Sequence, residues 1–169
     1  MTVTLHRVSK LRYAALPDLE DYGYGAARFG SRWNSPDADL RFDRRIVYAS
    51  DTLPLAMLEV IVHVDSDVLQ RVPHEHVLLD AEEAFIAQLL AADLPAGWNA
   101  HPETATTQVI GDQWYDEGAS AILRLPSAVL PPEDYGPAHS NYLIHARHPE
   151  ILRAVLHLGH RELRFDPRL

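Results

Sequence analysis

The chain has 169 residues, of which 47% are apolar and 23% are charged. This composition is typical of one globular domain with an ordinary core, and it excludes a disordered or collagen-like chain. Fifteen Lys and Arg residues against 24 Asp and Glu residues give a formal net charge of -9, which disfavours binding to nucleic acid or to an anionic membrane through bulk electrostatics. An anionic ligand would therefore need a local arginine site.

The chain contains no cysteine, which excludes a disulfide scaffold, a thiolate zinc site and a cysteine nucleophile. Residues 1–7 lack the apolar stretch of a signal peptide, and no run approaches the roughly 20 apolar residues of a membrane span. We therefore expect a cytoplasmic protein. No internal repeat and no proline-rich linker divides the sequence, so one domain is expected over residues 1–169.

Three elements are predicted in the first quarter of the chain. Alternation of apolar and polar residues over 3–8 predicts a half-buried strand. The glycines, prolines and acids from Pro17 to Asp39 predict a long irregular loop, and loops of that length in small domains are usually functional. A short strand is expected over residues 46–49.

The strongest helix prediction follows that strand. Ser50 or Asp51 is expected to cap a helix that includes Pro54 in its first turn and runs to about Val64. Further along, residues 76–79 resemble a strand. A helix is expected over about residues 81–92, and it stops before a turn at 95–98.

The last third of the chain predicts one more helix and two strands. The helix spans about residues 104–116 and ends with Gly118 as its C-cap. The strands are expected over residues 121–125 and 153–157. Because strands and helices interleave irregularly, without a repeating βαβ register, the pattern favours an α+β fold over a doubly wound parallel sheet.

Glu59 lies within residues 55–62, where every other residue is apolar. At 3.6 residues per turn such a helix is apolar nearly all round, which predicts that it is buried. An ionised carboxylate in that setting costs several kcal/mol unless it is paired or hydrogen-bonded. Glu59 therefore belongs either to an internal salt bridge with an arginine or to a functional site at a cleft.

A second candidate is the glycine-flanked segment 30–36, with the sequence GSRWNSP. Arg32 can bind an anion through two parallel hydrogen bonds, and Trp33 offers an aromatic face. These residue types suit a phosphorylated, ring-bearing ligand. The alternative is a loop pinned by a buried Trp33 and an Arg32 salt bridge.

Two other motifs are incomplete. The Gly23-Tyr24-Gly25 segment has Arg28 where a dinucleotide-binding fingerprint needs its third glycine, and no clear strand precedes it. Ser127 lacks the G-x-S-x-G elbow of a serine hydrolase. We therefore expect neither a Rossmann-type dinucleotide site at residues 23–28 nor serine hydrolase chemistry at Ser127.

The ten histidines are candidate metal ligands. Glu59 and His63 are four residues apart on one helix face, but a third ligand at motif spacing is missing. His74 and His76 would share a strand face, which is more typical of a solvated edge than of a metal site. We therefore expect no metal.

Ten short segments resemble the RES-domain family, and in this order they cover almost the whole chain. They are Leu5-His6-Arg7-Val8, Gly25-Ala26, Gly30-Ser31-Arg32-Trp33-Asn34-Ser35, Val47-Tyr48-Ala49-Ser50, Ala56-Met57-Leu58-Glu59-Val60, Pro95-Ala96-Gly97-Trp98, Gly111-Asp112-Gln113-Trp114, Pro126-Ser127-Ala128-Val129, Asn141-Tyr142-Leu143 and Phe165-Asp166-Pro167-Arg168-Leu169. The family takes its name from an Arg, a Glu and a Ser, which the matches place at Arg32, Glu59 and Ser127.

The resemblance implies a fold similar to the ADP-ribosyltransferase core and the function of a bacterial toxin that destroys NAD. NAD would be the substrate, and no cofactor is expected. The implied partner is an antitoxin with an Xre-like helix-turn-helix, which covers the active site and would make any contact with DNA. A homodimer within the antitoxin complex is a further expectation.

Roles for individual residues follow from the implied reaction. Breaking the bond between nicotinamide and ribose builds positive charge on the ribose, and a nearby carboxylate stabilises that charge. The expected catalytic residues are Glu59, Arg32, Tyr48 and Ser127. The expected NAD-binding residues are Arg7, Arg32, Trp33, Tyr48 and Ser127. Here the arginines neutralise the diphosphate, Tyr48 positions the nicotinamide or its ribose, and Ser127 donates a hydrogen bond to the ligand.

The acceptor of the ADP-ribosyl group is left open by the sequence. Inorganic phosphate gives a phosphorolysis, water gives a glycohydrolysis, and a protein side chain gives an ADP-ribosylation. The resemblance favours NAD degradation, with phosphate ahead of water. Modification of a host protein and a non-catalytic interaction module are the alternatives.

Overall fold

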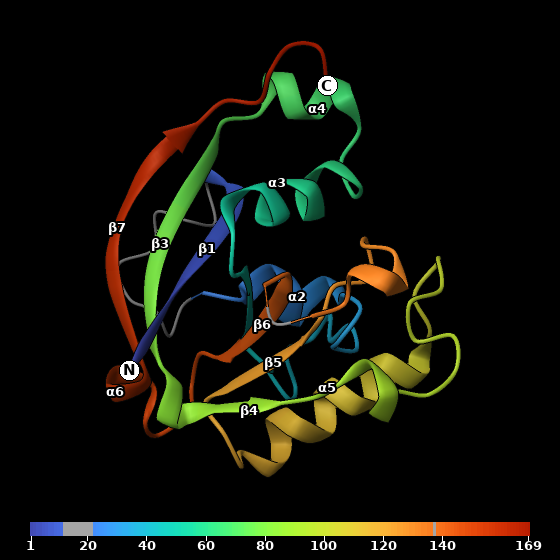
Figure 1. Ribbon diagram of the computed structural model, residues 1–169, viewed down its shortest axis with the longest axis vertical. Coiled ribbons are helices and arrows are strands. Elements are labelled where there is room, and N and C mark those ends of the chain that lie inside the picture. Colours follow the sequence, from blue (N-terminus) through green and yellow to red (C-terminus); the bar gives the residue numbers. More distant parts are fainter. Residues whose placement is uncertain (12–21, 137) are drawn as a thin grey trace.

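The computed structural model describes residues 1–11, 22–136 and 138–169. They form a single α+β domain around one seven-stranded sheet, with the strand order β4-β5-β6-β2-β1-β3-β7 (Figure 1). Among the strand pairs of the described residues, only β4–β5 is parallel. The predicted α+β class is therefore confirmed.

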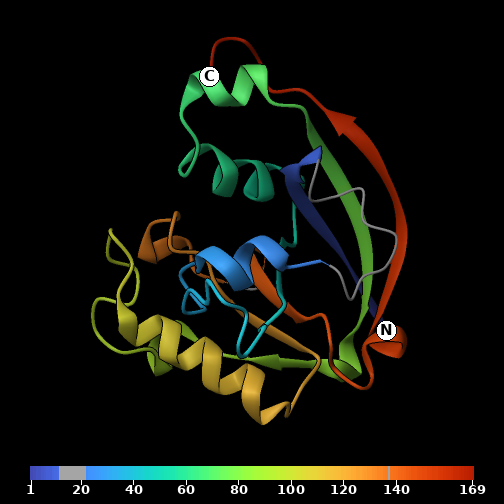
Figure 2. The same cartoon turned by 180° about the vertical axis from the view of Figure 1, so that it is seen from behind.

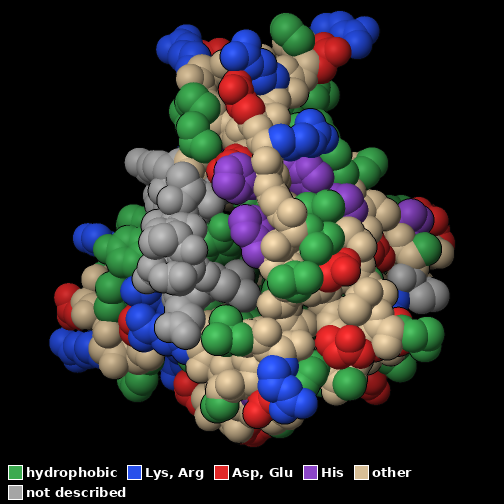
Figure 3. Space-filling model, turned by 90° about the vertical axis from the view of Figure 1, so that its left-hand side faces the viewer, with side chains coloured by type: hydrophobic (Ala, Val, Ile, Leu, Met, Phe, Trp, Pro, Cys, Tyr) green, Lys and Arg blue, Asp and Glu red, His purple; other side chains and the backbone are tan. Residues whose placement is uncertain are grey.

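Three long strands form one half of the sheet: β1 (Thr2–Lys10), β3 (His74–Glu82) and β7 (Val155–Leu163). β3 lies between the other two and pairs antiparallel with both, along nearly its whole length. In Figure 1 these strands run together along one side of the molecule. The exposed edge, β7, carries the stacked side chains of His157 and His160, and Figure 3 shows histidines gathered on this face.

The other half of the sheet contains β2 (Ile46–Ser50), β6 (Ser140–His145), β5 (Ile122–Pro126) and the short β4 (Ile86–Gln88). β6 pairs antiparallel with both β2 and β5, each along five residues. β2 is the strand of this half that lies next to β1 in the strand order.

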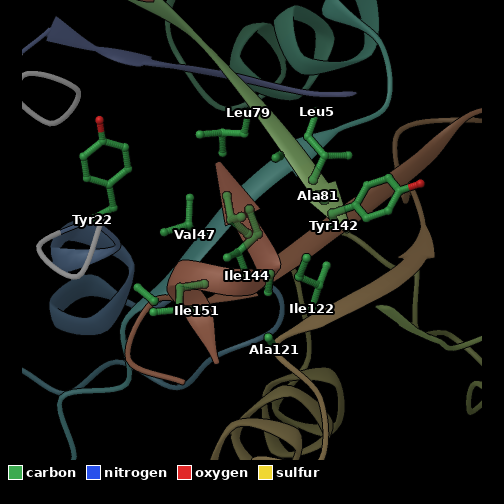
Figure 4. Close-up of a cluster of buried hydrophobic side chains, with 14 of the residues drawn as sticks. Leu5, Tyr22, Val47, Leu79, Ala81, Ala121, Ile122, Tyr142, Ile144 and Ile151 are labelled. Atoms are coloured by element: carbon green, nitrogen blue, oxygen red, sulfur yellow. The ribbon is translucent and has the colours of Figure 1, made fainter. Parts of the chain in front are cut away.

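The two halves are joined by very little sheet pairing, because β1 and β2 share the single register pair His6–Ser50. One face of each half instead packs against the other through a shared apolar cluster (Figure 4). Leu5 and Leu79 contribute to this cluster from the first half, and Val47 and Ile144 contribute from the second. The β1–β2 joint is consequently a break in the sheet.

Helices pack against both halves of the sheet (Figure 2). α3 (Leu53–Ile61) and α4 (Ser66–Arg71) pack on the first half, where Ala56 and Leu69 join a cluster with Val8 and Phe165. α5 (Ala105–Glu117) packs on the second half through a tryptophan-rich cluster, and α2 (Tyr24–Phe29) contacts β2. The described residues also contain four shorter helical segments: η2 (Glu83–Phe85), η3 (Ala91–Asp93), η4 (Pro132–Asp134) and α6 (Ile151–Ala154).

Several predicted elements are present with shifted ends. The strands expected over 3–8, 46–49 and 76–79 lie within β1, β2 and β3, and the strand expected over 121–125 is β5, one residue later. The helix expected over 104–116 is α5, and Gly118 caps it with a left-handed φ of 57°. Its backbone N–H donates to the Trp114 carbonyl, which satisfies the helix end as predicted.

The predicted cap of α3 was wrong. Thr52 is the N-cap and accepts a hydrogen bond from the Leu55 N–H at 3.3 Å, and the helix ends at Ile61. Ser50 is still part of β2, and Asp51 continues the ladder because its N–H donates to the Ser140 carbonyl. Strand pairing therefore takes both predicted caps away from the helix.

The helix predicted over 81–92 does not exist. Ala81 and Glu82 belong to β3, where they pair with Val3 and Thr2, and the chain then forms η2, β4 and η3. Pairing with β1 along nine residues outweighs the local preference of this segment for helix.

Two other predictions need correction, and two elements were missed. Residues 153 and 154 lie in α6, and the strand begins only at Val155. Within the expected loop Pro17–Asp39, residues 24–29 form α2, and residues 17–21 lie outside the described part of the chain. Neither α4 nor β6 was predicted from the sequence.

His74 and His76 do not lie on a solvated edge, as the sequence suggested. Both side chains are buried, because β3 has a strand on each side. The His74 ring packs edge-on against Phe165, and the His76 ring stacks on His6. Among the helices of the described residues, none has the length and apolar character needed to cross a membrane.

Candidate functional site

A cavity of about 460 Å³ opens at the break between β1 and β2. This volume falls within the usual range of ligand pockets. Its walls come from β1 and β2, from α3 and the two residues after it, and from the Ser31–Trp33 segment. Two further loops, around Asn99–His101 and Ala128–Val129, and Asn141 of β6 complete the lining. Among the described residues of the wall, the Arg, Lys, Asp and Glu side chains are those of Arg7, Arg32 and Glu59. The cavity is therefore suited to an anionic ligand.

Glu59 faces this cavity from α3 and is partly exposed. Its Oε1 accepts a hydrogen bond from the Ser127 hydroxyl at 2.6 Å and a second from the Asn141 side-chain amide. No described residue donates to Oε2, and Glu59 has no ion pair with any described arginine. The predicted alternative, an internal salt bridge between Glu59 and an arginine, is thus wrong. The prediction that the whole helix is buried is also wrong, because only Leu55 and Ala56 of α3 are buried.

Asn141 fixes the Glu59 carboxylate from the neighbouring strand. The Asn141 Oδ1 accepts from the Ser50 hydroxyl at 2.7 Å, so its amide nitrogen must point toward Glu59. Ser50 and Asn141 are opposite each other in the β2–β6 register. Two strands and the segment after β5 therefore hold one carboxylate oxygen and leave the other available to a ligand.

Residues 31–35, called here the Arg32 segment, are held by α5. The Gln108 amide donates to the Ser31 carbonyl at 3.2 Å, and Asp112 accepts from the Ser35 N–H at 3.1 Å. Between them, Gly111 packs directly under the Trp33 carbonyl, where an added Cβ would lie 1.7 Å from the oxygen. The spacing of 108, 111 and 112 places all three contacts on one helix face.

Arg32 ties this segment to a second loop. Its Nη1 donates to the main-chain carbonyls of Trp98 and Ala100, each at 3.0 Å. Trp33 is buried against Trp98 and has only 3% of its surface exposed. The predicted pinning of the loop by Trp33 is present, whereas the expected Arg32 salt bridge is replaced by bonds to neutral carbonyls.

Tyr48 lies on β2 at the base of the cavity. Its hydroxyl donates to Asn34 Oδ1 at 2.6 Å and accepts from the Trp33 N–H at 3.3 Å. Burial raises the pKa of Tyr48 above its ordinary value, so the phenol stays protonated. Tyr48 thus holds the Arg32 segment against β2. Because its hydroxyl is already hydrogen-bonded, we expect its aromatic ring to contact a ligand.

Arg7 enters the cavity from β1. Its Nη1 donates to the Tyr48 carbonyl at 3.1 Å across the break in the sheet, and its buried Nε has no hydrogen-bond partner. Burial lowers the pKa of Arg7 to about 10, and the nearby Tyr22 opposes this shift. Among the described residues no carboxylate pairs with Arg7, so a bound anion would supply the missing counter-charge.

Five of the six predicted site residues line the cavity: Arg7, Arg32, Trp33, Tyr48 and Glu59. Ser127 is fully buried behind Glu59, where its hydroxyl also accepts from the Val129 N–H. Reasoning from residue types missed Asn141 and His6. Asn141 was noted only as part of a short family motif, without a role. His6 was noted only beside Arg7 in the predicted strand, and its partner His76 is 70 residues away, so the sequence could not show the pair.

Within the described residues, no group of three or more His, Cys, Asp or Glu side chains is arranged to hold a metal ion. Glu59 and His63 both border the cavity, but His63 lies beyond the end of α3 and is exposed.

The amino-acid sequence is similar to those of several proteins that are named as toxins. "Toxin Res" of Yersinia enterocolitica is 32% identical over 166 residues, covering 98% of each chain, and "Toxin Res" of Pseudomonas putida is 33% identical over 146 residues, covering 86% of this chain and 89% of that protein. A Sphingobium protein named "Prs ADP-ribosylating toxin" is 33% identical over 155 residues, covering 87% of this chain and 84% of that protein.

A solved structure shares the fold. The toxin–antitoxin complex MbcT–MbcA of M. tuberculosis contains a chain with a TM-score of 0.71 and 17% identity, covering 97% of this chain and 85% of that chain. The sequence profile described as "RES domain" matches residues 4–166. On this match and on identities above 30% along nearly complete chains, the chain belongs to the RES-domain family.

Proposed function

We propose that the protein is the toxin of a bacterial toxin–antitoxin pair and that it cleaves NAD at the bond between nicotinamide and ribose. The observation that carries this proposal is the cavity wall. It sets one half-free carboxylate against two guanidinium groups that lack carboxylate partners among the described residues. A dinucleotide needs both features, because its diphosphate is anionic and its departing nicotinamide leaves positive charge on the ribose.

In the proposed reaction, the C–N bond of the nicotinamide ribose breaks and its electron pair leaves with the nicotinamide nitrogen, which neutralises the ring. The free Oε2 of Glu59 stabilises the positive charge that develops on the ribose, or holds the ribose hydroxyls. Arg7 and Arg32 bind the diphosphate, and Tyr48 and Trp33 position the substrate. Ser127 acts through Glu59, because its hydroxyl donates to that carboxylate.

An oxygen of inorganic phosphate then forms the new bond to the ribose carbon, and water is the second candidate acceptor. A time course of phosphorus NMR spectra with NAD and the purified protein distinguishes these reactions. Phosphorolysis is expected to give a new sugar phosphate only in phosphate buffer, whereas hydrolysis gives ADP-ribose in any buffer. Unchanged NAD in both conditions, with folded protein, would contradict the proposed chemistry.

Transfer of ADP-ribose to a protein is the second candidate function. It is favoured by the name of the Sphingobium relative, which is 33% identical. The two reactions share the NAD cavity and differ in what reaches the ribose carbon. Labelled adenine of NAD that becomes attached to protein in a cell extract would support this second reaction over NAD degradation.

The toxin assignment is supported by the names of the relatives and by the fold shared with a chain of the MbcT–MbcA toxin–antitoxin complex. The proposed partner is an antitoxin with an Xre-like helix-turn-helix. Expression of the chain alone should arrest growth and deplete cellular NAD, and co-expression of the neighbouring open reading frame should restore both. Normal growth with active, folded protein would count against the assignment.

Replacement of Arg32 by lysine is expected to weaken NAD binding by about tenfold, even though the charge is kept. An ammonium cannot donate two parallel hydrogen bonds to a phosphate while it also holds two carbonyls. Calorimetric titration of NAD into a catalytically inactive background measures the change. Arg28→Lys is the matched control, since Arg28 is exposed on α2 and donates to the Tyr24 hydroxyl of the same helix. Equal affinities for both variants would remove Arg32 from the substrate site.

A further inference from the structure

His6 and His76 form a pair at the break in the sheet. His6 Nδ1 and His76 Nε2 are 2.9 Å apart, and the two rings are nearly parallel with centroids 5.1 Å apart. One proton must lie between the two nitrogens for this distance to be a hydrogen bond. His76 is buried in the middle of the first half of the sheet, so it fixes the position of the His6 ring.

The second nitrogen of His6 is the one offered to the cavity. His6 is part of the cavity wall, and its Nδ1 is already used by His76. Nε2 makes no hydrogen bond to a described residue and is not one of the buried polar atoms left without a partner. His6 also pairs with Ser50, whose hydroxyl leads through Asn141 to Glu59. This backbone pair places His6 next to the strand whose Ser50 supports the candidate catalytic carboxylate through Asn141.

We propose that His6 is a substrate-contacting residue whose protonated ring donates Nε2–H to a phosphate oxygen in the cavity while Nδ1–H donates to His76. The proposal rests on the proposed function for the identity of the substrate. The phosphate group is either that of the NAD diphosphate or inorganic phosphate serving as acceptor. His76 is a positioning residue that acts only through His6.

The surrounding charges decide which ring of the pair takes up a proton. Burial lowers the pKa of both histidines, so the pair is uncharged near neutral pH. Asp51, at the end of β2, favours the charged form of His6, whereas Arg161 on β7 and His6 itself disfavour the charged form of His76. A proton that enters the pair therefore resides on His6.

The other charged groups around the cavity act in opposite directions. Arg7, Arg32 and Glu59 line the same cavity, as do the rings of His63 and His101. By the sign of their charges, the two guanidinium groups oppose protonation of His6 and the carboxylate favours it. A bound phosphate neutralises the arginines and adds negative charge beside Nε2. Substrate binding should therefore take up one proton, and affinity should rise as the pH falls.

The first test is calorimetric titration of NAD into a Glu59→Gln background, which prevents turnover, between pH 6 and pH 8.5. The diphosphate of NAD does not titrate in this range, so the pH dependence reports on the protein. We expect affinity to increase by up to about tenfold per pH unit on lowering the pH, until the free His6 is itself protonated. Titrations in two buffers of different ionisation enthalpy should show uptake of about one proton.

Three further substitutions in that background identify the group. His6→Gln keeps a neutral donor near the Nε2 position and should abolish proton uptake and flatten the pH profile, with binding about tenfold weaker at pH 6.5. His76→Gln should shift the midpoint of the profile without removing it. The matched control His157→Gln replaces an exposed histidine of β7, away from the cavity, and should behave as the background does.

The source of the phosphate is resolved on the folded wild-type protein by nitrogen NMR of its histidine rings at pH 8. A shift of His6 Nε2 with inorganic phosphate alone assigns the acceptor, and a shift with NAD alone assigns the diphosphate. A phosphate-induced shift without NAD consumption would retain this inference and contradict the proposed reaction. No shift with either probe, or unchanged proton uptake in His6→Gln, would overturn the inference even if NAD is consumed.

Discussion

Replacement of Glu59 by glutamine is expected to lower NAD turnover at least about 100-fold while the fold is retained. Glutamine has nearly the same shape, and its side-chain oxygen can still accept from Ser127 and Asn141. It removes the negative charge that faces the developing charge on the ribose. Because Glu59 has no ion pair with a described arginine, no buried cation is left behind, and the melting temperature should change little. Phosphorus NMR of NAD consumption and thermal melting measure the two quantities.

Two variants separate the charge of Glu59 from other causes of lost activity. Glu117→Gln changes an exposed carboxylate at the end of α5 and should leave turnover unchanged. Ser127→Ala keeps the Glu59 charge but removes one of its two hydrogen bonds, so a smaller loss of about tenfold is expected. Turnover by Glu59→Gln at a rate close to that of the wild type would make Glu59 a structural residue.

Replacement of Gly111 by alanine is expected to destabilise the protein by about 2 kcal/mol or more and to reduce NAD turnover. Alanine favours helix over glycine by about 1 kcal/mol, so an exposed site in α5 would be stabilised. Here the new methyl group would lie 1.7 Å from the Trp33 carbonyl oxygen, which is part of the main chain and cannot rotate away. Overpacking costs about 1–3 kcal/mol and more where backbone must move, so the clash outweighs the gain in helix propensity.

Thermal melting should show a fall of about 4–8 °C for this variant. Because the displaced segment carries Arg32 and Trp33, turnover should fall by about tenfold to 100-fold even at temperatures where the variant is folded. Gly136→Ala is the matched control, since an added Cβ there would meet nothing within 4 Å. A Gly111→Ala variant with wild-type melting and turnover would show that α5 does not position the Arg32 segment.

The sequence by itself was sufficient for the features that depend on nearby residues. Strong alternation predicted β1, the C-cap glycine predicted the end of α5, and irregular interleaving of elements predicted the α+β class. Glu59 was recognised because a charge among apolar neighbours needs a reason whatever the fold, and Arg32 because its segment combines a guanidinium with glycine and tryptophan. These inferences rest on chemistry within one turn or one loop.

Only the tertiary structure decided the features that depend on distant parts of the chain. Pairing of residues 81 and 82 with β1 replaced a predicted helix, and the β2–β6 ladder took Ser50 and Asp51 from the start of α3. The partners of Glu59 are 68 and 82 residues away, and His76 is 70 residues from His6. The cavity itself exists because β1 and β2 share one register pair, so the sheet breaks between them. Local sequence carries no record of such a break, since it results from packing two half-sheets around one apolar core.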